Sequence, residues 1–395
     1  MKLSNRISTL TGDGDDGWAL LYRARALKAD GTEITDLTIG EHDIRTDPSI
    51  LAAMTESAKG GHTGYASVPG TKPLRDAVAA RVRARTGVPT TRDNVLITAG
   101  GQSALFAAHH ACCDEGDTAA YIEPYYATYP GTIRTVGAIP RAVPVQADNG
   151  FQPTATDLAA ARGARSLLIN TPNNPTGVIY TRQTIETISK TVFENDMWLI
   201  SDEVYDTQIW RGEHLSPRAI DRMATRTLVV GSMSKSHAMT GSRIGWVIAD
   251  APVIEHLRDL ATHTTYGVAG FIQDAAHFAL TDDPELERRV GASFERRRKI
   301  AMDILGAQNT VRLIPSDGAM YLMLDIRATG LSRDSFADTL LDHHNIAVMP
   351  GESFGQAAAG HIRVAMTVDD DVLAEALRTL CAFAKNFYPI KNRTL

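Results

Sequence analysis

The sequence predicts an α/β protein in which a mostly parallel β-sheet lies between helices and a smaller α+β domain is attached. Three observations carry this prediction. Between about residues 94 and 250, short apolar runs alternate with helix-like segments, which is typical of a parallel sheet covered on both faces. Polar segments follow directly after several of these runs. From about residue 285, long helical patterns flank two isolated strand-like runs instead.

The alternating region contains a series of strand-like runs, and the first is followed by the helical pattern "GGQSALFAAHHACC". The carboxyl ends of parallel strands meet at one edge of a sheet, where ligands bind in such folds. We therefore expect the polar segments after these strands to converge on one crevice. The predicted strands are residues 94–98, 118–123, 164–170, 197–203 and 227–232. The converging segments are residues 100–102, 170–177, 202–205 and 232–235.

The chain has 395 residues, which is long for a single hydrophobic core. We predict a large ligand-binding domain over residues 46–284. The small domain combines residues 1–45 with residues 285–395, because the first segment precedes the alternating pattern. Its two predicted strands are "AMYLMLDI" at 319–326 and "HIRVAM" at 361–366.

The composition argues against several classes of partner. A formal net charge of −6 disfavours nucleic acid or an anionic membrane as the main partner. No apolar run approaches the roughly 18 residues of a membrane span. The first 17 residues lack the apolar core of a signal or transit peptide. The three cysteines, two of them adjacent, form no disulfide framework, so we expect a reducing, cytoplasmic location.

Two motifs resemble binding sites but are not interpreted as such. "GDGDDG" at 12–17 has the G-x-G-x-x-G spacing, but no strand precedes it and its aspartates would repel a pyrophosphate. His109 and Cys113 lie one helical turn apart, but no second ligand pair accompanies them, so no metal site is expected.

The segment "GSMSKSHAMTGSR" at 231–243 places a lone lysine, Lys235, at the end of an apolar strand. An amine at such a position is costly unless it is bonded to something. Asp202 ends another apolar strand, and a carboxylate there requires a cation for the same reason. Both positions therefore indicate a bound ligand.

Five features of the converging segments describe that ligand. The glycines after residue 98 expose backbone amides at a helix N-terminus, which favours a phosphate. Aromatic rings at 123–130 suit a flat ring, and the asparagines at 170–177 suit a phenolic oxygen. Asp202 suits a basic ring nitrogen, and Lys235 suits an aldehyde. Pyridoxal 5'-phosphate (PLP) has all five groups.

Four motifs resemble those of a known enzyme family: "SMSKSHAMTGSRIGW", "NNPTG", "DEVY" and "HIRVAM". From about residue 30 to its end, the chain resembles the class I/II aminotransferases, the aspartate-aminotransferase-like PLP enzymes of fold type I. The resemblance implies a seven-stranded, mostly parallel sheet in the large domain. It also implies transfer of an amino group between an L-amino acid and a 2-oxo acid, by a ping-pong cycle between the pyridoxal and pyridoxamine forms of the cofactor.

The resemblance assigns roles to residues around the cofactor. It implies that Lys235 carries the cofactor covalently and shuttles the proton, and that Asp202 pairs with the pyridine nitrogen. Asn174 and Tyr205 would bond the phenolic oxygen, and Tyr126 would stack on the ring. The residues implied for the phosphate are Gly101, Gln102, Ser232, Ser234 and Arg243.

Other implied roles concern the substrate and a second subunit. Arg363 would clamp the substrate α-carboxylate, with Asn174 beside it. Gly40 would provide backbone that closes over the substrate. Tyr65 would reach the phosphate of the neighbouring subunit, which implies a homodimer with two shared active sites.

The chain departs from dicarboxylate-specific relatives, which supply a second cation for a distal carboxylate. One subgroup uses a lysine where this chain has Gln102, and another uses an arginine within the region that reads "ATHTTYGVAGFIQ" here. The sequence therefore does not predict aspartate as the natural amino donor. His42 and Arg45 also depart from the family pattern, and our hypothesis is that one of them reaches the substrate side chain.

Three other functions are weighed against transamination. The same cofactor site can run β-elimination or decarboxylation, and only the pyridoxamine form separates these from amino transfer. A non-catalytic PLP-binding sensor would carry an extra DNA-binding module, for which the roughly 30 residues before the match are too few. A nicotinamide-dependent oxidoreductase would need a glycine fingerprint directly after a strand.

Overall fold

The computed structural model describes residues 1–12, 18–331 and 333–387, so most of the "GDGDDG" segment lies outside the described residues. The strands are β1 (Thr35–Asp36), β2 (Val95–Thr98), β3 (Thr118–Glu123), β4 (Ile139–Pro144), β5 (Ser166–Asn170), β6 (Trp198–Asp202), β7 (Thr227–Ser232), β8 (Gly245–Ile248), β9 (Arg312–Leu313), β10 (Tyr321–Asp325), β11 (Ile346–Ala347), β12 (Met349–Pro350) and β13 (His361–Ala365). The helices are α1 (Asn5–Ser8), α2 (Ala19–Ala29), α3 (Pro48–Lys59), α4 (Lys72–Thr86), α5 (Gly100–Cys112), α6 (Tyr129–Thr135), α7 (Ala155–Leu158), α8 (Arg182–Glu194), α9 (Met233–Ser236), α10 (Ala251–His263), α11 (Gly270–Thr281), α12 (Glu285–Gly306), α13 (Arg333–His344) and α14 (Asp370–Phe387).

The large sheet has seven strands in the order β2-β8-β7-β6-β5-β3-β4. Strand β8 runs antiparallel to both of its neighbours, and the other pairs are parallel. The predicted mostly parallel α/β architecture is therefore confirmed. The sequence analysis did not identify β4 or β8. Strand β4 contains two prolines, which cannot donate to a ladder, and it lies at the edge of the sheet, where prolines are tolerated.

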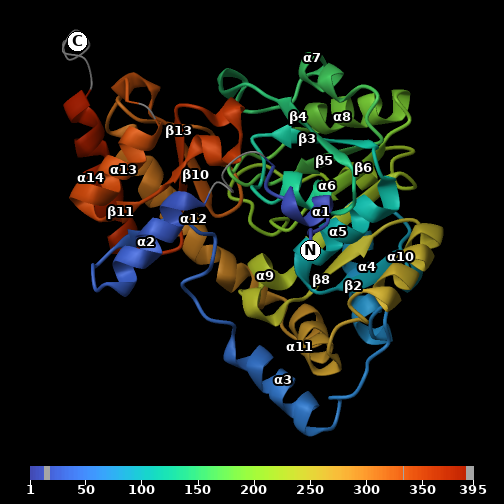
Figure 1. The fold of residues 1–395 in the computed structure, drawn as a ribbon. Helices are drawn as coiled ribbons and strands as arrows, with labels where there is room; N and C mark the ends of the chain where they lie inside the picture. The colour runs from blue at the N-terminus through green and yellow to red at the C-terminus, as the bar shows by residue number, and fades with distance from the viewer. Residues whose placement is uncertain (13–17, 332, 388–395) are drawn as a thin grey trace.

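Helices cover both faces of this sheet because each central strand sends alternate apolar side chains to opposite sides. On one face, Leu168 and Ile200 pack against α5, α6 and α10. On the other, Leu167 and Leu199 pack against α8. At the β2 edge of that second face, a further cluster brings in α3, α4 and α11. Figure 1 shows β3, β5 and β6 between these helical layers.

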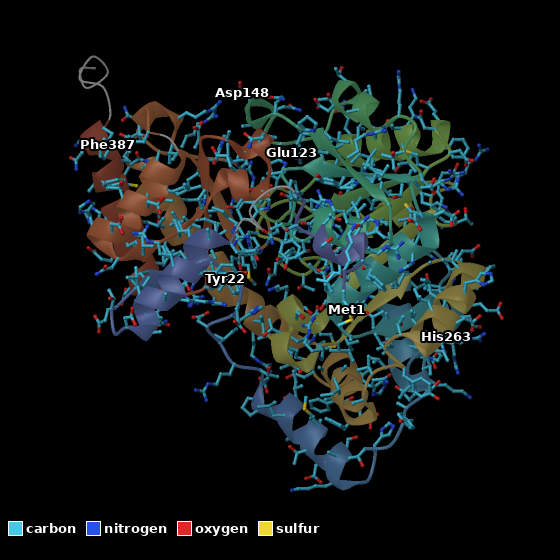
Figure 2. The ribbon with its side chains drawn as sticks, in the orientation of Figure 1. Met1, Tyr22, Glu123, Asp148, His263 and Phe387 are labelled. Atoms are coloured by element: carbon cyan, nitrogen blue, oxygen red, sulfur yellow. The ribbon has the colours of Figure 1, made fainter. Side chains whose placement is uncertain are left out.

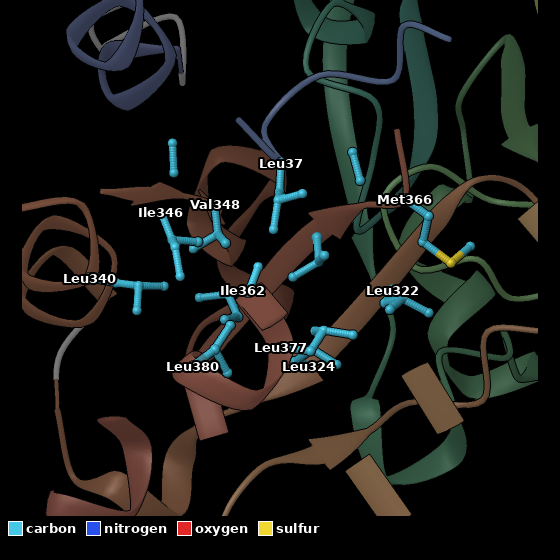
Figure 3. Close-up of a cluster of buried hydrophobic side chains, with 14 of the residues drawn as sticks. Leu37, Leu322, Leu324, Leu340, Ile346, Val348, Ile362, Met366, Leu377 and Leu380 are labelled. Atoms are coloured by element: carbon cyan, nitrogen blue, oxygen red, sulfur yellow. The ribbon is translucent and has the colours of Figure 1, made fainter. Parts of the chain in front are cut away.

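The second part of the molecule is built on a small antiparallel sheet in the order β12-β13-β10-β9. Strand β1 pairs with β11, and α2 packs in the same hydrophobic cluster as α13 and α14. Figure 1 shows α2 beside α13, and Figure 3 shows the leucines and isoleucines of this core. The segments before residue 45 and after residue 285 thus share one core. The proposed domain bounds 46–284, 1–45 and 285–395 stay predictions.

Helix α12 joins the two cores. Near its start, Leu286 packs with the β2-edge cluster of the large sheet, and two turns later Phe294 packs in the core of the small sheet. No helix in the described parts of the chain has the length and apolarity needed to cross a membrane.

Leu377 tests the small core. It is completely buried in α14, whereas Val372 of the same helix is 42% exposed. Leu377→Ala removes packing that the surroundings cannot refill, and should lower the free energy of unfolding by about 2–5 kcal/mol. Val372→Ala is the matched control, and should change it by less than about 0.5 kcal/mol. Chemical denaturation measures both, and equal effects would contradict this packing.

Candidate active site

A cavity of about 450 Å³ lies where the two sheets face each other. Its wall contains side chains or backbone from the ends of several large-sheet strands and from β10 and β13 of the small sheet. The predicted residues that line it are Gly40, Gly101, Gln102, Tyr126, Asn174, Asp202, Tyr205, Ser232, Ser234, Lys235, Arg243 and Arg363. The expected convergence on one crevice is therefore present in the structure.

A larger hollow of about 730 Å³ adjoins this cavity and shares Trp18, Tyr22 and Gln102 with it. Its wall is mostly apolar and hydroxyl-bearing, and it includes neither Lys235 nor Arg363. The concentration of ionisable groups thus assigns the chemistry to the smaller cavity.

Asp202 lies at the carboxyl end of β6 and is only 3% exposed. The Tyr129 hydroxyl donates to its Oδ2 at 2.7 Å, and the Val204 backbone N–H donates to its Oδ1 at 3.3 Å. Burial raises the pKa of Asp202 to about 6, although these hydrogen bonds oppose the rise. The sequence analysis missed Tyr129. The available signal was its position three residues after Tyr126 in "YYATYP".

Lys235 follows the end of β7 by three residues, in the short helix α9. Its Nζ donates to the backbone carbonyl of Gly40. Burial lowers the pKa of Lys235 to about 8, which leaves a useful fraction of neutral, nucleophilic amine near neutral pH. His42 Nε2 and Gln208 Nε2 lie 2.9 and 3.2 Å from the Lys235 carbonyl oxygen and hold its backbone.

The start of α5 forms a cradle for an anion. The first backbone N–H groups of this 13-residue helix have no partner within the helix, and the helix dipole adds a positive potential. Gly100 has φ +80°, and a Cβ there would collide with the Arg243 guanidinium, so glycine permits this close approach. The hydroxyls of Ser232 and Ser234 lie 3.0 Å apart beside it.

Gln102 lines the cavity, but its side-chain amide already has partners. Its Nε2 donates to the Thr132 hydroxyl at 2.6 Å, and its Oε1 accepts from the Thr128 hydroxyl at 3.0 Å. In this arrangement the backbone N–H of Gln102 lies in the first turn of α5, while the side chain fastens α5 to α6.

Arg363 lies on β13 and is 1% exposed. Its Nη1 donates to Asn174 Oδ1 at 2.8 Å, its Nη2 donates to the Thr38 carbonyl, and its Nε is buried without a hydrogen-bond partner. The guanidinium lies between the rings of Tyr321 and Phe354, 4.5 and 4.4 Å from their centroids. Across the described residues, Arg363 forms no ion pair. A buried cation with neutral partners and a spare donor suits an anionic ligand.

Tyr321 is a second site residue that the sequence analysis missed. Its hydroxyl lies 2.9 Å from the Tyr205 hydroxyl, and Asn174 Nδ2 donates to it at 3.5 Å. A Cβ at Gly40 would collide with this hydroxyl, so the close approach requires glycine. Its signal was its place at the start of the predicted strand 319–326, but the sequence alone does not show that this strand faces the large sheet.

Three predicted residues lie outside the cavity wall. His42 packs edge-on against the ring of Phe294 and contacts the Lys235 carbonyl. Burial lowers the pKa of His42 to about 4. Arg45 is exposed and does not line the cavity. The structure therefore gives no support to the hypothesis that either residue reaches the substrate side chain. Tyr65 is 91% exposed and contacts the ring of Tyr266 rather than the cavity of its own chain.

Instead, α2 and the residue after Gly40 supply side chains that sequence reasoning did not select. Trp18, Tyr22 and Arg25 are spaced by three or four residues, so they share one helix face, and all three line the cavity. Figure 2 marks Tyr22 on α2. Arg25 is a cation at a position that the comparison with dicarboxylate-specific relatives did not consider. Glu41 also lines the cavity.

A family model matches the sequence of this chain. The model described as "Aminotransferase class I and II" covers residues 32–380. The chain belongs to this family. It is a PLP-dependent aminotransferase, and the family predicted from the four motifs is confirmed.

Similar proteins agree with this assignment. The chain is 41% identical to the arginine–pyruvate transaminase of Pseudomonas aeruginosa over 387 residues, 97% of this chain and 98% of the relative. It is 30% identical to an aspartate aminotransferase of Bacillus sp. strain YM-2, covering 97% and 99% of the two chains. A solved aspartate aminotransferase from Thermus thermophilus, with maleate, superposes with a TM-score of 0.89 at 30% identity, covering 98% and 99%. None of these names favours a lyase or a sensor.

The residues of the cavity fit PLP. They offer a buried carboxylate, a primary amine with a lowered pKa, and an anion cradle that a Cβ at Gly100 would fill. In the part of the chain that the structure describes, no group of three or more histidine, cysteine, aspartate or glutamate side chains is arranged to hold a metal ion.

The lowered pKa of Lys235 predicts how the apoenzyme takes up PLP. Only the neutral amine attacks an aldehyde, so the rate of covalent attachment should rise as pH increases through about 8 and level off above about pH 9. An ordinary lysine, with a pKa near 10.4, would give a rate that still rises there. Stopped-flow absorbance measures the rate, with Nα-acetyl-lysine as a parallel control for the ionisations of PLP itself. Matching profiles for protein and control would contradict the shift.

Proposed function

We propose that some cavity residues bind the cofactor and that others bind the substrate. When bound, PLP supplies an aldehyde that accepts an amino group and a protonated ring that accepts electrons. Lys235 would hold that aldehyde covalently, and its Nζ would hold and move the proton during amino transfer. Asp202 keeps the ring nitrogen protonated. The observation that carries this proposal is the meeting of Lys235, Asp202 and Arg363 in one cavity.

The remaining cofactor contacts follow from the chemistry of the wall. Asn174 and Tyr205 would hold the phenolic oxygen; in the structure, both contact the Tyr321 hydroxyl. Tyr126 covers the ring face. The phosphate is held by the backbone of Gly101 and Gln102 and by the side chains of Ser232, Ser234 and Arg243.

Arg363 binds the substrate α-carboxylate in this proposal. Its Nη1 is oriented by Asn174 and its Nη2 by the Thr38 carbonyl, so the guanidinium is already fixed before substrate arrives. Its unpartnered Nε is a donor for the carboxylate. The Gly40 backbone closes the same side of the cavity, next to the Lys235 amine.

For the substrates, we propose an L-amino acid donor and a 2-oxo acid acceptor in a ping-pong cycle. The relative with 41% identity is named for arginine and pyruvate, which makes these the first pair to test. Relatives near 30% identity are named for aspartate, and Arg25 in the cavity wall is a cation suited to a distal carboxylate. Arginine and aspartate are therefore compared directly.

We further propose a cytoplasmic homodimer with two shared sites. Tyr65 is 91% exposed and does not line the cavity of its own chain, which suits a side chain that completes the site of a neighbouring subunit. The three cysteines are free, as expected in a reducing compartment.

Amino transfer is tested by a half-reaction. L-Arginine or L-aspartate added to the holoenzyme without any keto acid should convert bound PLP into pyridoxamine phosphate, and pyruvate should then restore PLP with release of alanine. Lys235→Ala should lower turnover by at least about a thousandfold, because both the covalent attachment and the proton transfer are lost. Lys190→Ala, at a lysine whose side chain is 74% exposed, is the control. Product formation with PLP unchanged would indicate a lyase, and binding without turnover a sensor.

The shared site is tested with mixed dimers. In a dimer of wild-type and Lys235→Ala chains, the functional lysine site should receive Tyr65 from the variant chain. Adding Tyr65→Phe to that variant chain should weaken PLP binding at the intact lysine site by roughly fivefold, because one phosphate hydrogen bond is lost in trans. Adding Tyr65→Phe to the wild-type chain instead is the control and should leave that site unchanged. Equal affinities in both arrangements, or a fully active monomer, would contradict the proposal.

A further inference from the structure

Tyr129 makes the shorter of the two hydrogen bonds that the described residues donate to the Asp202 carboxylate. It is 2% exposed at the start of α6, and its hydroxyl donates to Asp202 Oδ2 at 2.7 Å. The other hydrogen bond to this carboxylate among the described residues comes from the Val204 backbone at 3.3 Å. Tyr129 is therefore the side-chain donor that fixes the orientation of the carboxylate.

The position of Tyr129 is itself fixed by its neighbours. Its ring meets the ring of Tyr126 edge-on, with the centroids 5.7 Å apart. Thr128 and Thr132, which flank it along the chain, hold the side chain of Gln102 in the first turn of α5. The hydroxyl of Tyr129 is thus held in place at the start of α6, directly after the segment that contains Tyr126.

This hydrogen bond also affects the charge of Asp202. Burial favours the neutral form of a carboxylic acid, and a donated hydrogen bond favours the anion. Burial likewise raises the pKa of Tyr129, so its hydroxyl stays protonated and remains a donor at any working pH. A carboxylate that is to pair with a protonated ring nitrogen has to be ionised near neutral pH.

We propose that Tyr129 is a positioning residue of the cofactor site, which holds the Asp202 carboxylate ionised and correctly oriented for the ring nitrogen of PLP. This inference rests on the proposed function, because that function assigns Asp202 to the ring nitrogen. Tyr129 acts through Asp202 and does not itself contact the reacting atoms.

The test uses apoenzyme and two ligands: PLP, and the deaza analogue in which carbon replaces the ring nitrogen. Tyr129→Phe keeps the ring and removes one hydroxyl. It should weaken PLP binding about tenfold, since a hydrogen bond to a charged group is lost, but should change affinity for the analogue less than about twofold. Tyr180→Phe is the control, because Tyr180 is also 2% exposed but does not line the cavity, and both affinities should stay unchanged. Fluorescence titration gives the dissociation constants.

Stability of the apoenzyme provides a second readout. A carboxylic acid whose pKa is raised by folding stabilises the protein most at low pH, and the contribution falls as pH rises from about 4 to the folded pKa. In wild type this loss is largely over once the pH has risen through about 6. In Tyr129→Phe it should continue to higher pH, so the difference in Tm between the two proteins should grow from pH 5 to pH 8. A general packing defect would lower Tm equally at every pH.

Other ionisable groups lie around Asp202 but do not change in this comparison. They are Glu203 next to it in the chain, Tyr126 and Tyr205 in the cavity wall, and Lys235, Arg243 and Arg363 across the cavity. Because all are present in both proteins, a pH-dependent difference reports on the contact between Tyr129 and Asp202.

Several outcomes would overturn the inference. Equal weakening of PLP and its deaza analogue would show a general packing role, and unchanged PLP affinity would show no role. Should Tyr129→Phe not fold, Tyr129→His, which keeps a donor on a smaller ring, should bind PLP better than Tyr129→Ala, and equal affinities would refute the inference. Failure of the wild-type protein to bind either ligand would instead refute the proposed function, so the two failures are distinguishable.

Discussion

The active site depends on three ionisable groups that are held out of water and bonded to neutral partners. Arg363 is bonded to an amide and a carbonyl, Asp202 to a phenol and a backbone N–H, and Lys235 to a carbonyl. Among the residues that the structure describes, none of the three is in an ion pair. Neutral partners fix the geometry of each group and leave its charge for a ligand, and the cost of burying these charges is offset when the ligand binds.

The two-sheet architecture is what brings these groups together. Parallel strands β5, β6 and β7 lie side by side, so Asn170, Asp202 and Ser232 end at one edge. Arg363 and Tyr321 come from the small sheet, on the opposite side of the cavity. Asn174 bonds Arg363, and Tyr205 bonds Tyr321, so polar contacts connect the two sheets directly across the site.

The part of the site that all α-amino acids share is separate from the part that distinguishes them. In the proposed function, Lys235, Asp202 and Arg363 act on groups that every substrate of this reaction shares. The cavity wall also contains four residues from segments before the large sheet, Trp18, Tyr22, Arg25 and Glu41. Relatives of this chain are named for arginine or for aspartate, and one fold can host different specificities.

The sequence by itself determined the α/β class, the aminotransferase family and the strands that end at Asp202 and Ser232, because these depend on local patterns of apolar residues and on specific motifs. Tertiary structure decided the rest. The edge strand β4 bears two prolines, and β8 is only four residues long and lies between β2 and β7, so the place of each strand is fixed by its pairing with other strands. Tyr129 bonds Asp202 across 73 residues, and Tyr321 reaches Tyr205 across 116. The contact of His42 with the Lys235 backbone was likewise not foreseen, because only folding places residues 193 apart beside each other.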